Sequence, residues 1–214
     1  MSQPTRHPAD DLLLDYGRGV LEPGRSLVLN AHLGVCRACR AVVRAVEAVG
    51  GVLLQDLPPS EMAADALDRA LTKLEVGTAA PAARPPQPSD WIRIPGEVVD
   101  AARRGRRWAA PGVWVANVTG DARRGPRSYL LRVAAGMAVP RHTHDGGEFT
   151  CVLKGAFEDR GVVYGPGDFV ACDEGVEHRP RVTSDGECVC LIAADSPLVP
   201  RDLIGRIFQP FVGI

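Results

Sequence analysis

Residues 136–155 read GMAVPRHTHDGGEFTCVLKG, and this stretch decides the fold of the second half of the chain. In an extended segment, His142 and His144 are two residues apart, so their imidazoles point to the same side. The tight Asp-Gly-Gly turn at 145–147 then brings Glu148 back near that side. This concentration of imidazole and carboxylate groups suits a divalent metal ion.

One further histidine, His178, lies in this half of the chain. Three neutral imidazoles and one carboxylate suit Zn, Mn, Fe, Ni or Cu, with coordination positions open to water or a ligand. The stretch resembles the first motif of the cupin family at every fixed position. The second motif fits at Gly167, Gly175 and His178, but Asp173 replaces the usual proline and Val182 the usual asparagine. The resemblance implies a cupin barrel that holds a metal. Its implied ligands are His142, His144, Glu148 and His178.

The sequence around this motif is typical of an all-β domain. Short apolar runs rich in β-branched residues alternate with turns that contain glycine, proline and aspartate. Many short strands over about 115 residues predict a sandwich or a barrel. The predicted strands cover residues 112–118, 128–134, 147–153, 161–164, 168–172 and 188–193.

A proline-rich segment separates this part from the beginning of the chain. Residues 81–90 read PAARPPQPSD, with four prolines in the first eight positions. Neither a helix nor a central strand tolerates that density of proline. We therefore predict a domain at residues 1–80, a linker at 81–90 and a second domain at 91–214.

The first 80 residues are predicted to form four short helices. Three of them cover residues 10–16, 26–33 and 36–49. We expect the second to end at Gly34 in a left-handed conformation and the third to end at Gly50-Gly51. A fourth begins at a Ser60 cap and has an apolar stripe at helical spacing. So small a core often needs a metal or a partner for stability.

The helical part contains the pattern His32-x3-Cys36-x2-Cys39. Cys36 and Cys39 lie on one face at the start of a helix, and His32 lies one turn earlier. Two thiolates and an imidazole suit tetrahedral Zn²⁺, and His7 is the other histidine of this half that could complete the site. The alternatives are a redox dithiol, or two ordinary buried cysteines beside a surface histidine.

This pattern resembles the zinc-binding anti-sigma family of bacteria. Followed by a proline-rich linker and a cupin barrel, it resembles the ChrR-type anti-sigma factors over essentially the whole chain. The resemblance implies that the helical domain binds an extracytoplasmic-function sigma factor in a 1:1 complex. It further implies that the cupin domain responds to singlet oxygen or a related small oxidant, after which the sigma factor is released. The implied zinc ligands are His7, His32, Cys36 and Cys39.

The composition restricts the function further. The 214 residues carry 25 basic and 26 acidic side chains, a net charge of −1, and the first 80 carry 8 basic and 10 acidic. This balance disfavours direct nucleic-acid binding. No apolar run has the roughly 18–20 residues of a membrane span, and the N-terminus lacks the apolar stretch of a secretory signal. We expect a cytoplasmic protein, in which six cysteines indicate metal or redox chemistry rather than disulfides.

We therefore predict a transcriptional regulator rather than an enzyme, with Zn²⁺ in the helical domain and Zn²⁺ or another divalent metal in the cupin domain. The alternative is a metal-dependent cupin enzyme, a dioxygenase or an isomerase, with an N-terminal zinc docking domain. A freestanding cupin enzyme has no need of the His-Cys-Cys cluster, and this favours regulation. Cys188 and Cys190 fit small core residues, with a redox role as the alternative.

Overall fold

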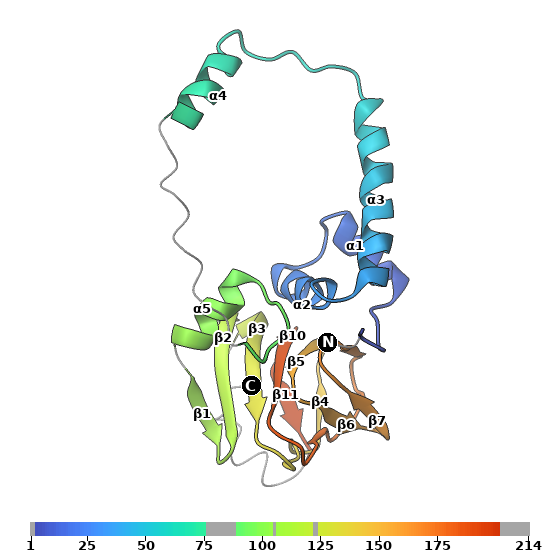
Figure 1. Cartoon of the computed structure of the whole chain (residues 1–214), viewed down its shortest axis with the longest axis vertical. Helices are drawn as coiled ribbons and strands as arrows, with labels where there is room; N and C mark the ends of the chain where they lie inside the picture. Colours follow the sequence, from blue (N-terminus) through green and yellow to red (C-terminus); the bar gives the residue numbers. More distant parts are fainter. Residues whose placement is uncertain (1–2, 76–88, 105, 122–123, 202–214) are drawn as a thin grey trace.

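In the computed structural model, helices occupy the first part of the chain and strands the second, which is the predicted order (Figure 1). The model describes residues 3–75, 89–104, 106–121 and 124–201. The helices are α1 (Asp10–Gly17), α2 (Pro23–Leu33), α3 (Arg37–Gln55), α4 (Ala66–Glu75) and α5 (Gly96–Arg104). The strands are β1 (Arg107–Ala110), β2 (Val113–Asp121), β3 (Arg124–Val133), β4 (His142–His144), β5 (Glu148–Lys154), β6 (Phe157–Asp159), β7 (Val162–Tyr164), β8 (Phe169–Cys172), β9 (Arg181–Val182), β10 (Cys188–Ala194) and β11 (Leu198–Pro200).

The bounds of α2 follow from its terminal residues. Pro23 opens the helix, where its missing N–H would have no partner in any case. The Glu22 carboxylate before it accepts hydrogen bonds from two backbone N–H groups of the first turn. The prediction for Gly34 was wrong, because its φ of −55° is right-handed. A side chain there would lie 3.1 Å from the Arg93 carbonyl oxygen, so this glycine permits a close approach of two segments.

Helix α3 is longer than predicted. It passes through Gly50-Gly51, where we expected it to stop, and ends at Gln55. Neither glycine has the left-handed conformation that would terminate a helix. The residues after them continue the helical hydrogen bonds as far as Asp56 N–H to Val52 O, at 3.2 Å. In Figure 1 the second half of α3 projects away from the rest of the molecule.

Helix α4 begins later than predicted, at Ala66 rather than after Ser60. Asp65 stands immediately before it, and its carbonyl oxygen accepts the first helical hydrogen bond, from Arg69 N–H at 3.0 Å. The predicted apolar stripe is present, but its leucines face outward rather than into a core. The helix stands apart from the other labelled elements in Figure 1.

The strands form three sheets that build a barrel. The largest has six strands in the order β1-β2-β3-β10-β5-β8, with antiparallel neighbours. β11 pairs with β4, and β6 pairs with both β7 and β9. The six predicted strands correspond to β2, β3, β5, β7, β8 and β10. The short strands β1, β6, β9 and β11, and helix α5, were not predicted.

Both faces of the six-stranded sheet are covered. Along β10, Cys188, Cys190 and Ile192 alternate with Val189 and Leu191, and all are buried. Because side chains on a strand alternate between faces, the first set lines the barrel interior and the second faces the helices. A strand with no exposed residue therefore indicates a sheet that lies between two layers.

The helical part and the barrel share one hydrophobic core. This core joins Val28 and Leu29 of α2 and Val98 of α5 to Cys151 of β5 and Leu191 of β10. The predicted linker at 81–90 lies mostly outside the described residues, which resume at residue 89. None of the helices in the described ranges has both the length and the hydropathy needed to cross a membrane.

Candidate metal centres

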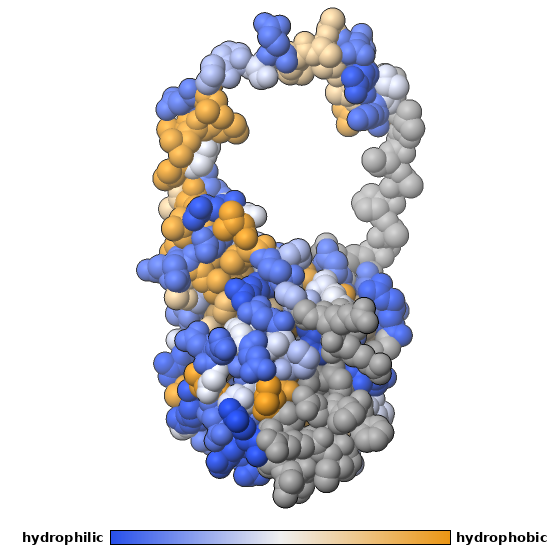
Figure 2. All heavy atoms as spheres, turned by 180° about the vertical axis from the view of Figure 1, so that it is seen from behind, coloured by the Kyte–Doolittle hydropathy of each residue, from blue (hydrophilic) through white to orange (hydrophobic). Residues whose placement is uncertain are grey.

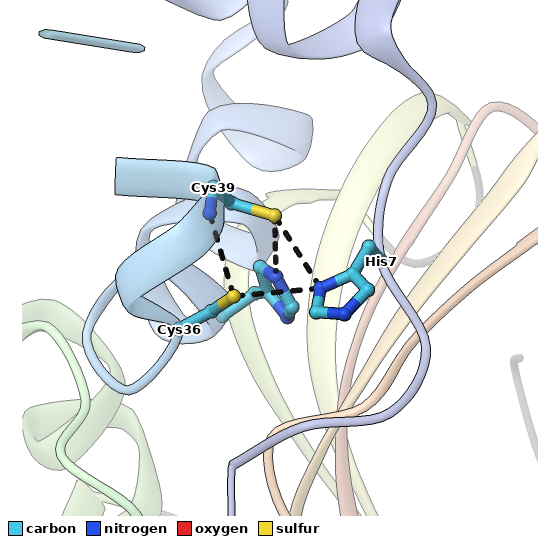
Figure 3. Close-up of side chains that lie close together, drawn as sticks. His7, Cys36 and Cys39 are labelled. Atoms are coloured by element: carbon cyan, nitrogen blue, oxygen red, sulfur yellow. Dashed lines mark hydrogen bonds between the residues drawn. The ribbon is translucent and has the colours of Figure 1, made fainter. Parts of the chain in front are cut away.

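Four side chains from three segments meet beside the barrel and form what we call the helical cluster: His7, His32, Cys36 and Cys39. His7 precedes α1, His32 lies in the last turn of α2, and the two cysteines lie at the start of α3 (Figure 3). Cys36 is the N-cap residue of α3, and its sulfur accepts a hydrogen bond from Cys39 N–H at 3.5 Å. His7 is exposed, whereas the other three side chains are buried.

The spacing of the donor atoms in this cluster fits one tetrahedral ion. All four lie within 4.8 Å of one another. The His32 Nε2 to Cys39 Sγ distance is 3.3 Å, and His7 Nδ1 lies 3.4 Å from Cys36 Sγ and 3.5 Å from Cys39 Sγ. Usual Zn–N and Zn–S bond lengths place the two kinds of donor about 3.6 Å apart in a tetrahedron. The donor set and its spacing therefore fit Zn²⁺.

The electrostatics of the helical cluster favour a bound cation. Burial and the hydrogen bond to Cys36 raise the pKa of the Cys39 thiol to about 12. Burial lowers the pKa of His32. A thiolate in this position therefore needs a positive counter-charge, and a divalent ion supplies it.

A second cluster lies inside the barrel and contains His142, His144 and His178, which we call the barrel cluster. His142 and His178 are held side by side by a pair of backbone hydrogen bonds, 3.2 and 3.1 Å long. His144 Nε2 lies 3.1 Å from His178 Nε2, and all three imidazoles are buried. The structure thus brings the three histidines together from segments more than 30 residues apart.

Hydrogen bonds fix the orientation of two of these rings. His142 Nδ1 donates to the Pro140 carbonyl oxygen at 2.7 Å. His178 Nδ1 lies 3.2 Å from Asp159 Oδ2, and this carboxylate is 4% exposed. Each contact leaves Nε2 available for a metal, which is the usual arrangement of metal-binding histidines. Asp159 was not predicted, because in the sequence Glu-Asp-Arg-Gly it reads as an exposed turn residue.

Glu148, the fourth predicted ligand, lies at the edge of the barrel cluster. Its Oε2 is 3.7 Å from His144 Nε2, but it does not belong to the group whose donor atoms all lie within 4.8 Å of one another. The carboxyl group is buried, and Thr150 Oγ1 lies 3.5 Å from its Oε1. Burial raises the pKa of Glu148 to about 7.

The three imidazoles of the barrel cluster are neutral at neutral pH, as metal ligands must be. Burial is the main cause that lowers the pKa of His142 to about 4 and that of His144 to about 3. Neighbouring imidazoles lower both values further, and burial also lowers the pKa of His178. A cavity of about 70 Å³ adjoins the cluster, and its wall includes the thiols of Cys172, Cys188 and Cys190.

We predict that the metal-free protein loses stability as the pH falls from 6.5 toward 4.5. In the unfolded chain these histidines bind protons near pH 6.5, whereas His142 and His144 in the folded chain bind them only near pH 4 and 3. The unfolded state therefore binds more protons in this window, and the free energy of unfolding decreases as the pH falls. Glu148 acts in the opposite direction, because its raised pKa makes the folded state bind a proton more tightly than the unfolded state. It is one group against the two histidines, so the net loss of stability toward low pH remains.

Urea unfolding in the presence of a chelator at pH 6.5 and 4.5 measures this dependence. The double variant His142→Asn, His144→Asn should show a smaller difference between the two pH values than the wild type. Equal differences in the two proteins would contradict the prediction.

Residues 97–196 match the family model described as the ChrR cupin-like domain. The chain is 34% identical to the anti-sigma-E factor ChrR of Cereibacter sphaeroides, over 97% of this chain and 98% of that protein. It is also similar to ChrR in the crystal structure of Rhodobacter sphaeroides SigE in complex with the anti-sigma ChrR. That match has a TM-score of 0.74 and 33% identity, and covers 90% of this chain and 100% of the other. The predicted fold class is confirmed: a small four-helix domain of the zinc-containing kind is followed by a cupin barrel.

Proposed function

The chain belongs to the ChrR family of anti-sigma factors, and we propose that it binds an extracytoplasmic-function sigma factor in a 1:1 complex. While bound, the sigma factor cannot associate with RNA polymerase, so the protein represses transcription without contacting DNA. We place this activity in the cytoplasm. The relatives named anti-sigma-E factor ChrR and the complex of ChrR with SigE support this proposal.

One observation carries the proposal for this chain: a set of exposed apolar side chains on α3, on α4 and on the segment between them. Figure 2 shows apolar side chains gathered along α3, in the arm that projects from the body. Leu53 is 63% exposed and Leu71 48% exposed. The exposed apolar side chains of α4 stand apart from those of α3, and apolar patches left open to solvent in this way mark sites of protein–protein interaction (Figure 2). We call this set the helical apolar surface, and it consists of Val49, Val52, Leu53, Leu54, Leu57, Met62, Leu67, Leu71 and Leu74.

The helical cluster stabilises the half that carries this surface. We propose that His7, His32, Cys36 and Cys39 hold Zn²⁺, which ties the N-terminal segment, α2 and α3 together. Because α3 extends directly from the two cysteines, its direction is set at the metal centre. In this division of labour, residues 1–80 bind the sigma factor, residues 81–90 link the domains, and residues 91–214 form the sensor.

We propose that His142, His144, Glu148 and His178 hold Zn²⁺ or another divalent metal in the barrel, and that singlet oxygen or a related oxidant reacts there to release the sigma factor. The cavity of about 70 Å³ beside the cluster supports sensing over catalysis. Pockets for organic substrates usually measure about 300–1,000 Å³. The space suits a small oxidant, and its mostly apolar wall includes two histidines and three cysteines. This volume favours a small oxidant over the organic substrate of a dioxygenase or isomerase.

Transcription in vitro tests the central proposal. RNA polymerase with the extracytoplasmic-function sigma factor should lose its activity when the full chain is added at one molecule per sigma factor. The same polymerase with the principal sigma factor serves as the control and should keep its activity. Full activity of both holoenzymes at an excess of the protein would overturn the proposal.

We predict that Glu148→Gln and His142→Ala inhibit transcription normally but release the sigma factor poorly on exposure to singlet oxygen. Both side chains lie inside the barrel, away from the helical apolar surface, so they act on sensing rather than on binding. Glu177→Gln is the matched control, because Glu177 is exposed and pairs with Arg141 on the surface. Sigma factor release can be followed by the change in fluorescence anisotropy of a labelled sigma factor under illumination with a photosensitiser. Wild-type release by both barrel variants would remove the barrel metal from the mechanism.

A further inference from the structure

One turn of the barrel contacts both segments that carry the histidines of the helical cluster. The turn joins β7 to β8 and consists of residues 165–168, Gly-Pro-Gly-Asp. It lies against the N-terminal segment and against the loop that follows α2. It contributes no side chain to the group of donor atoms in the helical cluster.

The turn orients the imidazole of His32. His32 Nδ1 donates a hydrogen bond to the Gly167 carbonyl oxygen at 2.7 Å, and the ring is fully buried. This bond places the proton on Nδ1 and leaves Nε2 facing Cys39 Sγ. Phe169, the first residue of β8, packs edge-on against the same ring with centroids 6.1 Å apart. The barrel thus supplies both the hydrogen bond to this ring and one of its two aromatic neighbours, the other being His7 with centroids 5.6 Å apart.

The same turn holds the segment that carries His7. The buried Asp168 carboxylate accepts hydrogen bonds from the backbone N–H groups of Thr5 at 2.6 Å and of Arg6 at 3.0 Å. Phe169 N–H donates to the Arg6 carbonyl oxygen at 3.1 Å. Arg6 immediately precedes His7, so the backbone at this ligand is fixed by contacts with the barrel. The other oxygen of Asp168 accepts from Gly165 N–H at 2.8 Å, which closes the turn.

Only glycine fits at position 167 where the turn meets the helical part, for two reasons. Its φ of +91° lies in the left-handed region, which residues with a side chain rarely adopt. A Cβ atom there would lie 2.8 Å from Pro4 Cγ and 2.8 Å from Val35 Cγ2. The helical part thus approaches the barrel backbone more closely than any side chain at this position allows.

The turn is also fixed to the strand that carries Glu148. Gly167 N–H donates to the Val152 carbonyl oxygen at 2.8 Å, and Val152 N–H donates to the Asp168 carbonyl oxygen at 3.1 Å. Val152 belongs to β5, which begins at Glu148 beside the barrel cluster. At the other end of the pairing between β5 and β8, Glu148 stands opposite Cys172. Two paired strands therefore connect the barrel cluster to the turn.

We infer that the turn at 165–168 is a positioning element through which the barrel sets the metal affinity of the helical cluster. Gly167 and Asp168 act through His32 and His7 and are not themselves ligands. The inference rests on the proposed function, because it requires that His7, His32, Cys36 and Cys39 hold a metal. It gives the sensor domain a direct structural connection to the metal of the sigma-binding half.

Cobalt binding to the full chain tests the inference. A thiolate-to-cobalt charge-transfer band reports on the centre with Cys36 and Cys39, since the proposed barrel ligands include no thiolate. We expect Gly167→Ala to weaken Co²⁺ binding at this centre by about 10–100-fold, the usual effect of losing an outer partner of a metal ligand. Gly161→Ala is the matched control. Its φ of +78° imposes the same backbone strain, but nothing lies within 4 Å of the new methyl group.

Asp168→Asn is the second variant, which is nearly isosteric with the wild type. The amide NH₂ must face either Gly165 N–H or the N–H groups of Thr5 and Arg6, so a hydrogen bond of the turn is lost. We expect weaker Co²⁺ binding here as well. Backbone strain by itself would lower the thermal midpoints of Gly167→Ala and Gly161→Ala alike. Loss of positioning would lower the Co²⁺ affinity of Gly167→Ala and Asp168→Asn and leave that of Gly161→Ala unchanged.

Wild-type Co²⁺ affinity in both Gly167→Ala and Asp168→Asn would overturn the inference and leave the proposed zinc centre intact. A wild-type protein without the charge-transfer band would overturn the proposed zinc centre itself, and the inference with it.

Discussion

Replacing Cys36 and Cys39 together by alanine is expected to remove the metal of the helical cluster and to abolish co-purification with the sigma factor. The two sulfurs are half of the four donor atoms, and each lies about 3.5 Å or less from a neighbouring imidazole nitrogen. Structural zinc contributes about 10–16 kcal/mol of apparent binding free energy in zinc-finger peptides. Its loss is therefore large compared with the total stability of a small domain, which is about 5–15 kcal/mol.

Elemental analysis and co-purification measure this outcome. The wild type should contain about one metal ion in each domain, and the double variant should keep only that of the barrel. Cys151→Ala is the control, because Cys151 is a fully buried thiol of the shared core that lies outside both clusters. Undiminished sigma-factor binding by the double variant would contradict the proposed role of zinc.

Introducing two charges into the helical apolar surface, as Leu53→Glu and Leu71→Glu, is expected to weaken sigma-factor binding by a factor of 10³ or more. Central apolar side chains of an interface contribute about 2–4 kcal/mol each when they are truncated, and a buried unpaired carboxylate adds a further penalty. Glutamate is a good helix former, so α3 and α4 should persist. Both leucines are exposed in the free protein, and the stability of the variant should therefore remain near that of the wild type.

Val163→Glu is the matched control for the double leucine variant. Val163 is 57% exposed, but it lies on β7 of the barrel and is not part of the helical apolar surface. Titration calorimetry with the purified sigma factor gives the dissociation constants of the three proteins. If the double leucine variant bound as tightly as Val163→Glu, the sigma factor would have to bind another surface.

The two clusters were predictable from the sequence because their spacing follows from local backbone geometry. Residues three apart on a helix share a face, as Cys36 and Cys39 do, and residues two apart on a strand share a side, as His142 and His144 do. The assignment of the family likewise rested on these motifs and on their order along the chain. Whether each proposed ligand binds metal remains a prediction.

Other features could not be read from the sequence, because they depend on residues far apart in the chain. An apolar stripe indicates that one face of a helix avoids water, but not what covers it. The stripe of α2 lies buried on the barrel, whereas that of α4 is exposed. The glycine pair in α3 gave the wrong helix end, because glycine lowers helix stability without determining where a helix stops.

The sequence by itself determined the two metal-binding patterns, the order of the helical and β parts, and the family. Only the tertiary structure decided that both parts share one core, that Asp159 orients His178, and that the turn at 165–168 supports the helical cluster. The physical reason is the range of the contacts. Motif spacing is set by helix and strand periodicity within a few residues, whereas His32 and Gly167 are 135 residues apart and meet only when the helices pack on the barrel.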